Sequence, residues 1–455
     1  MKFILPLLLL SATGLLAQQD KWLLISPVRS FTIVANPQNP RVLYSGNWAN
    51  QIYRSEDAGA SWERMEIGGL DVLNYITSFA VSSKDTNVLL AGGFNFDGIR
   101  RSSDRGVTWE RVLTDSDFNK MSFISEAIIE DHASPGTFYG ARGVSYNDIW
   151  KSTDNGVTWD TVTRISDELT PRLCTITQRA DSTNIFFIGA KQGMVLRSDD
   201  YCKTWRATPI NGYPTIKGDA EIPKIVFSPT SPNIGYAVVT ATAPDSLGNN
   251  GGVLKTTDGG QSWTRIGFVD TSFWAVEARP RAGAEDEVFI GGFRIMNRPT
   301  VLKGDSLVYR SLDAGSSWTR YENIPWGENE SGDTIRNVWS LRWFPTIKKL
   351  FMATEPGIYV LDEPTSVSEN TVVRSHQSLR CNVLGNTLVV HDNSRPLNET
   401  TEWALYSMQA VCVSRGVVGA GLETEINLAS LPSGIYLVTW GTEQHFRTAH
   451  IALVR

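Results

Sequence analysis

The chain of 455 residues contains little histidine and little cysteine, has no excess of positive charge, and has no long apolar run beyond its first residues. Four of its five histidines lie after residue 370, and no metal-binding or serine-hydrolase motif is present, so we expect no metal, no cofactor and no Ser-His catalysis. The net charge of −6 offers no field that would attract phosphates, which argues against a nucleic-acid partner. No later segment has the roughly 18 uninterrupted apolar residues of a membrane-spanning helix, so no transmembrane segment is expected in the mature chain.

The N-terminus has the pattern of a secretory signal peptide over residues 1–17. Lys2 supplies the positive charge, residues 4–10 are apolar, and Ala17 ends a plausible cleavage site. An anchoring helix is the alternative, but the apolar run is short and is interrupted by polar residues and glycine. We therefore expect an exported protein, secreted or held at the outer surface of a bacterial cell.

Four cysteines in an exported chain could form two disulfides, whose pairing cannot be read from the sequence. Cys381 and Cys412 lie in one C-terminal segment and could pair. Cys174 is expected in an inner strand and Cys202 in a turn at the opposite end of the same repeat. That geometry favours two free, packed thiols.

What the chain does contain is a phrase, Ser/Thr-x-Asp-x-Gly-x-Ser/Thr-Trp, that occurs six times. Its tryptophans follow one another at intervals of 46 to 58 residues, which is the period of a four-stranded propeller blade. Each phrase lies between two short β-like runs, so it predicts a hairpin. The copies are residues 55–62, 102–109, 152–159, 198–205, 256–263 and 311–318.

The chemistry of the phrase suits a turn. The aspartate can accept hydrogen bonds from the amides of its own loop, the glycine allows a positive φ, and the tryptophan buries a flat side chain. The fourth copy has Cys202 in place of the glycine. We interpret the six aspartates as structural turn formers rather than catalytic acids. They are Asp57, Asp104, Asp154, Asp200, Asp258 and Asp313.

A seventh repeat is incomplete at its end. Residues 338–361 carry the strand pattern that precedes each phrase, but no phrase follows them, whereas residues 20–25 match the strand that normally comes after it. We predict that residues 21–26 pair with residues 357–362 and close the ring, because an unpaired edge would be left at both ends otherwise. The predicted fold is all-β, a seven-bladed β-propeller closed by an N-terminal strand and followed by a small C-terminal β-sandwich. An open, six-bladed propeller is the alternative.

The six phrases resemble Asp-box, or BNR, repeats, which occur in sialidases, sortilin receptors, xyloglucanase-type glycoside hydrolases and photosystem II assembly factors. The resemblance covers about residues 20–363. It implies that the aspartates belong to outer hairpins, away from the axial face where propeller enzymes act. Sialidase activity is disfavoured, since the Arg-Ile-Pro motif of that family is absent and Phe293-Arg-Ile-Met296 occurs late and lacks the proline.

The repeat ends near residue 364, and the predicted organisation is a signal peptide (1–17), a propeller (18–364), a linker (365–371) and a C-terminal domain (372–455). The run Leu431-Pro-Ser-Gly-Ile-Tyr-Leu-Val438 resembles the C-terminal sorting domain of proteins exported by the bacterial type IX secretion system. That resemblance implies the type IX machinery as a partner through residues 372–455. A fibronectin-like adhesion module is the alternative.

The candidate ligand site lies in the loops of the axial face, which join second to third strands and successive blades. The long loops 241–252, 292–307 and 321–335 are the main candidates, although each of their residues could instead be a solvated loop side chain. Asp97 and Glu328 form a candidate acid/base pair, whose separation the sequence does not define. The predicted ligand-binding residues are Phe96, Asp97, Arg142, Tyr146, Asp148, Arg294, Trp326 and Glu328.

These patterns favour a secreted or surface propeller that binds an extracellular polysaccharide or protein through its axial loops. The alternative is a glycoside hydrolase, xyloglucanase-like more than sialidase-like, on the same scaffold. A purely structural role in the cell envelope is a third possibility.

Overall fold

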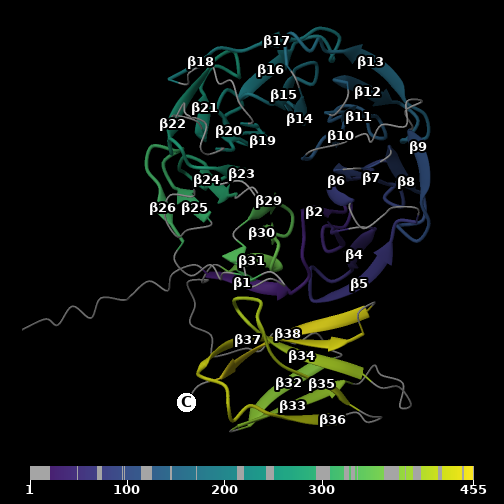
Figure 1. Ribbon diagram of the computed structural model, residues 1–455, viewed down its shortest axis with the longest axis vertical. Helices are drawn as coiled ribbons and strands as arrows, with labels where there is room; N and C mark the ends of the chain where they lie inside the picture. The colour runs from purple at the N-terminus through teal and green to yellow at the C-terminus, as the bar shows by residue number, and fades with distance from the viewer. Residues whose placement is uncertain are drawn as a thin grey trace, which may run out of the picture.

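The structure is a computed structural model in which all regular elements of the described residues are strands (Figure 1). None of the described segments is a helix long and apolar enough to cross a membrane. The predicted signal peptide and linker lie outside the described residues. The structure describes residues 21–48, 50–68, 74–94, 96, 98–113, 125–143, 146–170, 172–212, 220–241, 251–293, 308–321, 327–328, 334–335, 337–362, 379–384, 386–392, 401–418, 423–442 and 445–453.

Most of the described strands form four-stranded antiparallel units arranged around a ring, which confirms the predicted β-propeller (Figure 1). Blade 1 contains β2 (Thr32–Ala35), β3 (Leu43–Gly46), β4 (Gln51–Ser55) and β5 (Ser61–Glu66). Blade 2 contains β6 (Tyr75–Val81), β7 (Leu89–Phe94), β8 (Ile99–Ser102) and β9 (Glu110–Leu113). Blade 3 contains β10 (Ile128–Glu130), β11 (Phe138–Ala141), β12 (Asp148–Ser152) and β13 (Asp160–Arg164). Blades 4 and 5 are β14 (Leu173–Gln178), β15 (Phe186–Ala190), β16 (Met194–Ser198) and β17 (Arg206–Ala207); and β19 (Lys224–Phe227), β20 (Gly235–Val239), β21 (Gly252–Thr256) and β22 (Trp263–Gly267), with β18 (Ile210–Asn211) parallel to β22.

Blades 6 and 7 are β23 (Phe273–Arg279), β24 (Glu287–Gly292), β25 (Val308–Ser311) and β26 (Thr319–Arg320); and β29 (Val338–Phe344), β30 (Lys349–Thr354), β31 (Ile358–Asp362) and β1 (Lys21–Ser26). A small hairpin, β27 (Gly327–Glu328) and β28 (Thr334–Ile335), lies between these blades in the sequence. In every blade the first strand is innermost and lines the ring axis (Figure 1).

The N-terminal strand closes the ring. β1 pairs antiparallel with β31, with Trp22 opposite Leu361, as the sequence predicts. The Trp22 side chain is 2% exposed and packs edge-on against Phe289 and Tyr321 of blade 6, with ring centroids 6.4 and 6.1 Å away. The first strand of the chain thereby completes the last blade and also anchors it to its neighbour.

The repeated phrases form the turns between the third and fourth strands. In the first copy, Asp57 Oδ1 accepts a hydrogen bond from the Ser61 amide at 2.8 Å, Ser55 Oγ accepts one from the Gly59 amide at 2.8 Å, and Gly59 has a φ of 94°. The same pattern recurs in the fourth copy, where Cys202 takes a φ of 68° and its amide donates to Ser198 Oγ at 3.0 Å. The turn thus tolerates a side chain in a left-handed conformation instead of changing shape.

All four cysteines are free. Cys381 is buried and Cys412 is exposed, so the pairing considered for them is not formed. Cys174 and Cys202 are buried, and burial raises the pKa of Cys174 to about 11. None of the three buried thiols is therefore poised as a nucleophile.

The C-terminal part is a small β-sandwich, as predicted. One sheet contains β32 (Leu379–Leu384), β33 (Thr387–Asp392) and β36 (Glu423–Asn427); the other contains β34 (Thr401–Ser407), β35 (Cys412–Val418), β37 (Gly434–Gly441) and β38 (His445–Leu453), in the order β38-β37-β34-β35. Apolar side chains from both sheets, such as Leu388 and Val438, form one buried core.

This sandwich docks against the propeller, a contact that the sequence did not predict. β38 pairs with β5, so the sheet of blade 1 continues across into the C-terminal domain. The Thr448 amide donates to Ala60 O at 2.7 Å, and His450 Nε2 lies 2.6 Å from Leu24 O of the closing strand. Leu437 is fully buried in the same apolar cluster as Trp22. The C-terminal domain therefore covers the strand that closes the ring (Figure 1).

Candidate functional site

Three of the predicted site residues, Asp97, Arg294 and Trp326, lie outside the described residues. Glu328 lies in the short strand β27. Phe96 is described, and here the prediction of a ligand contact needs correction. Its ring is fully buried in the apolar cluster between blades 1 and 2, so no part of it is open to a ligand.

Arg142, Tyr146 and Asp148, by contrast, are brought together at the axial end of blade 3. Asp148 is fully buried, with Arg142 Nη1 at 3.4 Å from Oδ2 and Arg164 Nε at 2.7 Å from Oδ1. The guanidinium carbons of Arg142 and Arg164 lie 5.0 and 4.2 Å from the centroid of the Tyr146 ring. Since the Asp148 oxygens already face two guanidinium groups, this carboxylate holds the loop together rather than activating water. Sequence reasoning missed Arg164, which lies one strand further along.

A larger feature of the axial face is a chain of aromatic rings from four blades, here called the axial aromatic cluster. Trp48 and Tyr75 lie 4.6 Å apart between ring centroids, Phe31 and Trp339 lie 4.8 Å apart, and Trp274 and Trp339 lie 5.2 Å apart. Trp48, Tyr75 and Trp339 are half-buried. The cluster consists of Phe31, Trp48, Tyr75, Phe94, Trp274, Phe293 and Trp339.

The two tryptophans on inner strands reach this cluster because of β-bulges. The pairing register shifts between Phe273 and Ala275 in blade 6 and between Val338 and Ser340 in blade 7. The extra residue at each shift is Trp274 or Trp339, and a bulge re-aims its side chain out of the regular alternation. Both rings then meet Phe293 in one apolar group at the axis. The Phe-Trp and Val-Trp starts of these strands were the available sequence signal, but strict alternation gave no reason to point both rings at the axis.

Polar groups lie beside the aromatic cluster. Glu355, in the loop between β30 and β31, is 6% exposed and accepts a hydrogen bond from Asn337 Nδ2 at 3.3 Å. Burial raises the pKa of Glu355 to about 7, and the positive charge of Arg29 opposes that rise. The Arg29 guanidinium lies 4.3 Å above the Trp48 ring. The axial face thus combines aromatic surfaces with a carboxyl group that titrates near neutral pH.

Glu355 should make the protein less stable as the pH rises from about 4.5 to 7. In the folded chain the Glu355 carboxyl group stays protonated until the pH approaches its pKa of about 7. In the unfolded chain the same group loses its proton near its ordinary pKa of 4.5. Rising pH therefore favours unfolding between these two values and has no further effect above pH 7. The shift corresponds to about 3 kcal/mol of unfolding free energy. Urea titrations of wild type and Glu355→Gln across this pH range measure the difference. Equal pH dependence in the two proteins would show that Glu355 is not the titrating group.

Charged side chains from three inner strands and from the segment just before β10 meet at the axis and form what we call the channel ion cluster: Glu126, Lys224, Glu277 and Arg342. Glu126, at the start of blade 3, contacts Lys224 of blade 5 and lies 2.7 Å from Arg342 Nη2 of blade 7. Glu277 of blade 6 accepts a hydrogen bond from the Trp343 amide at 3.4 Å. Because one carboxylate touches cations from two non-adjacent blades, these side chains meet across the ring axis.

Comparison with known proteins agrees with the fold. A family model for sortilin (Sortilin-Vps10, neurotensin receptor 3) matches residues 147–292, which is less than half of the chain. No curated protein sequence matches. Among solved structures, the xyloglucanase of glycoside hydrolase family 74 from Xanthomonas campestris is 14% identical, with a TM-score of 0.55 over 93% of this chain and 72% of that chain.

Two further structures are similar. An ancestral enzyme of the same hydrolase family is 15% identical, with a TM-score of 0.55, and the match covers 96% of this chain but only 64% of that enzyme. YCF48 from Cyanidioschyzon merolae is 13% identical, with a TM-score of 0.53 over 76% of this chain and 99% of that chain. At these identities the similarity extends to the fold, and the chain is a β-propeller of the architecture shared by these proteins.

Proposed function

We propose that this protein is an exported β-propeller that binds an extracellular polysaccharide through the axial aromatic cluster. The observation that carries the proposal is the meeting of half-buried rings from blades 1, 2 and 7 beside Arg29, Asn337 and Glu355. Aromatic faces with a few polar groups are typical of sites that bind small or extended ligands. Sugar rings present apolar faces for stacking and hydroxyls for hydrogen bonding.

Removing one half-buried ring should weaken binding without unfolding the protein. Trp48→Ala and Tyr75→Ala should each lower affinity for the bound glycan about tenfold, because an aromatic contact contributes up to about 1.5 kcal/mol. A glycan array that includes xyloglucan oligosaccharides, followed by calorimetric titration of each hit, measures the effect.

The matched control is Trp159→Ala, which removes a half-buried tryptophan of the same type from an outer turn. Its affinity should equal that of wild type. An equal loss in Trp159→Ala and Trp48→Ala, or the absence of any glycan ligand, would contradict the proposal.

Glycoside hydrolysis is the second candidate, and the raised pKa of Glu355 favours it. A carboxyl group that is protonated near neutral pH can act as a general acid. Hydrolysis also needs a second carboxyl group about 5–10 Å away, for which Asp97 and Glu328 stay candidates. Release of reducing sugar by wild type but not by Glu355→Gln would make the enzyme the better description.

The proposal includes export through the type IX secretion system, supported by residues 1–17 and the run Leu431–Val438. Cell fractionation tests it: a chain without residues 372–455 should stay in the periplasm. Because that deletion also uncovers β1, the same segment should in parallel be fused to an unrelated exported reporter. A reporter that fails to reach the outer surface would refute this part of the proposal.

A further inference from the structure

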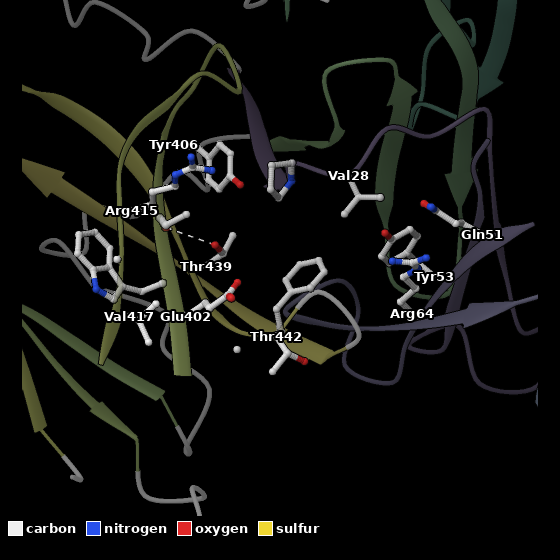
Figure 2. Close-up of a pocket in the computed structure, with 16 residues that line it drawn as sticks. Val28, Gln51, Tyr53, Arg64, Glu402, Tyr406, Arg415, Val417, Thr439 and Thr442 are labelled. Carbon is white, nitrogen blue, oxygen red and sulfur yellow. Dashed lines mark hydrogen bonds between the residues drawn. The ribbon is translucent and has the colours of Figure 1, made fainter. Parts of the chain in front are cut away.

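A cleft of about 710 Å³ separates blade 1 from the C-terminal sheet (Figure 2). The propeller side is lined by Gln51 and Tyr53 of β4 and Arg64 of β5, and the opposite side by residues of β34, β35 and β37. This volume is within the usual range of ligand pockets, about 300–1,000 Å³, and domain interfaces are common places for them. The cleft lies outside the axial face, so the proposed polysaccharide site does not account for it.

The cleft exists because the docked sheet carries small side chains at its centre. Along β37, alternate residues face the propeller, and they decrease in size from Leu437 through Thr439 to Gly441. Leu437 is buried against the propeller, and Phe446 at the other contact is 8% exposed beside Tyr53. Between these contacts, Thr439 lies opposite Ala404 of β34, and neither can fill the gap. The two domains therefore touch at both ends of the interface and separate between them.

The C-terminal wall of the cleft carries two charged side chains, Arg415 and Glu402, that do not contribute ion pairs among the described residues. Arg415 lies opposite Ala404, and Glu402 lies opposite Val417, so both charged side chains share one face of the sheet. Both are exposed, and among the described residues neither makes an ion pair or a side-chain hydrogen bond. Arg64 across the cleft is in an ion pair with Glu66 at 2.7 Å. Arg415 is thus the cation that the cleft offers to an incoming anion.

The surroundings of Arg415 narrow the class of ligand. Tyr406 lies on the same wall and supplies a half-buried ring with a polar edge, while Gln51 and Thr439 supply groups that hydrogen-bond to hydroxyls (Figure 2). A guanidinium group recognises a carboxylate through two parallel hydrogen bonds. We propose that this cleft binds a saccharide that carries a carboxylate, with the carboxylate on Arg415 and a sugar ring against Tyr406. This second site is independent of the axial one.

Calorimetric titration of the full-length protein with tetrasaccharides of galacturonate, mannuronate and glucuronate tests the site. At least one should bind, and its neutral methyl ester should bind about tenfold more weakly or not at all, because the charge-assisted hydrogen bonds are lost. Arg415→Gln should weaken binding of the acid by a similar factor. Thr439→Phe, which fills the floor of the cleft, should abolish binding.

Two control variants distinguish binding in this cleft from binding at the axial site and from a general effect of surface charge. Arg206→Gln removes an exposed arginine of blade 4, and Trp48→Ala removes an axial ring; both should bind the acidic sugar as wild type does. The inference would be overturned if no acidic tetrasaccharide bound, if the acid and its ester bound equally, or if Arg415→Gln bound as tightly as wild type. Loss of binding in Trp48→Ala alone would assign the sugar to the axial face instead.

Discussion

A chain that lacks residues 18–26 should unfold at a much lower temperature than the full protein. The deletion removes the fourth strand of blade 7 and leaves the edge of β31 unpaired. It also empties the site of Trp22, whose replacement by alanine should by itself cost about 3–5 kcal/mol. Since globular domains are stable by only about 5–15 kcal/mol, the deletion should remove most of the folding free energy. Calorimetric melting of the deletion variant and of Trp22→Ala measures both effects.

Lys21→Ala is the matched control, because it changes an exposed residue of the same strand. It should melt with the wild type. A deletion variant whose melting temperature lies within about 1 °C of wild type, a shift of about 1 kcal/mol for a chain of this length, would show that β1 does not close the ring.

Replacing Glu126 with alanine should destabilise the propeller by about 3 kcal/mol or more. The change leaves Lys224 and Arg342 facing each other at the axis without the carboxylate that both contact. Lys224 is buried and Arg342 is half-buried, so removing the carboxylate is costly mainly because the lysine has lost its hydration as well as its partner. Chemical denaturation of the variant and of the wild type measures the loss.

A second variant separates this effect from a general loss of packing. In Glu126→Leu combined with Lys224→Met, an apolar pair replaces the ions, and most of the stability should return. Glu110→Ala, which breaks an exposed ion pair with Arg101, is the surface control and should cost no more than about 1 kcal/mol. If Glu126→Ala cost no more than Glu110→Ala, the channel ion cluster would have no stabilising role.

Local features of the fold were predictable because the phrase that builds each turn is short and complete in itself. Asp57 accepts a hydrogen bond from Ser61 and Ser55 accepts one from Gly59, all within seven residues, so the same sequence motif specifies the same hairpin each time. Ring closure was predictable for a related reason. The strand around Trp22 carries the pattern of a fourth strand that blade 7 lacks.

The candidate site was predicted less well. Arg142, Tyr146 and Asp148 were expected in one loop and do lie together, but burial turns the carboxylate into an ion-pair partner of Arg164. Phe96 was expected to contact a ligand and is buried instead. An axial loop is identified by its place in the repeat, whereas the direction of each side chain within it depends on the neighbouring blade.

The axial aromatic cluster could not be found from the sequence, because it joins rings from blades 1, 2, 6 and 7. Trp274 and Trp339 reach it only through bulges that interrupt the regular alternation of their strands. The docking of the C-terminal domain could not be predicted from the sequence for the same reason. Residues near 447 pair with residues near 61, and no local pattern indicates a contact across that distance in the chain.

The sequence by itself determined the repeating unit, its turns, the closing strand and the all-β class, since these depend on hydrogen bonds and side-chain alternation within a few residues. Only the tertiary structure decided which side chains meet at the axis, that the C-terminal sandwich covers β1, and that a cleft with Arg415 on its wall lies between the domains. Those features arise where separate blades and sheets pack together. Packing responds to the size and direction of every side chain at once, and so it is not specified by any single segment.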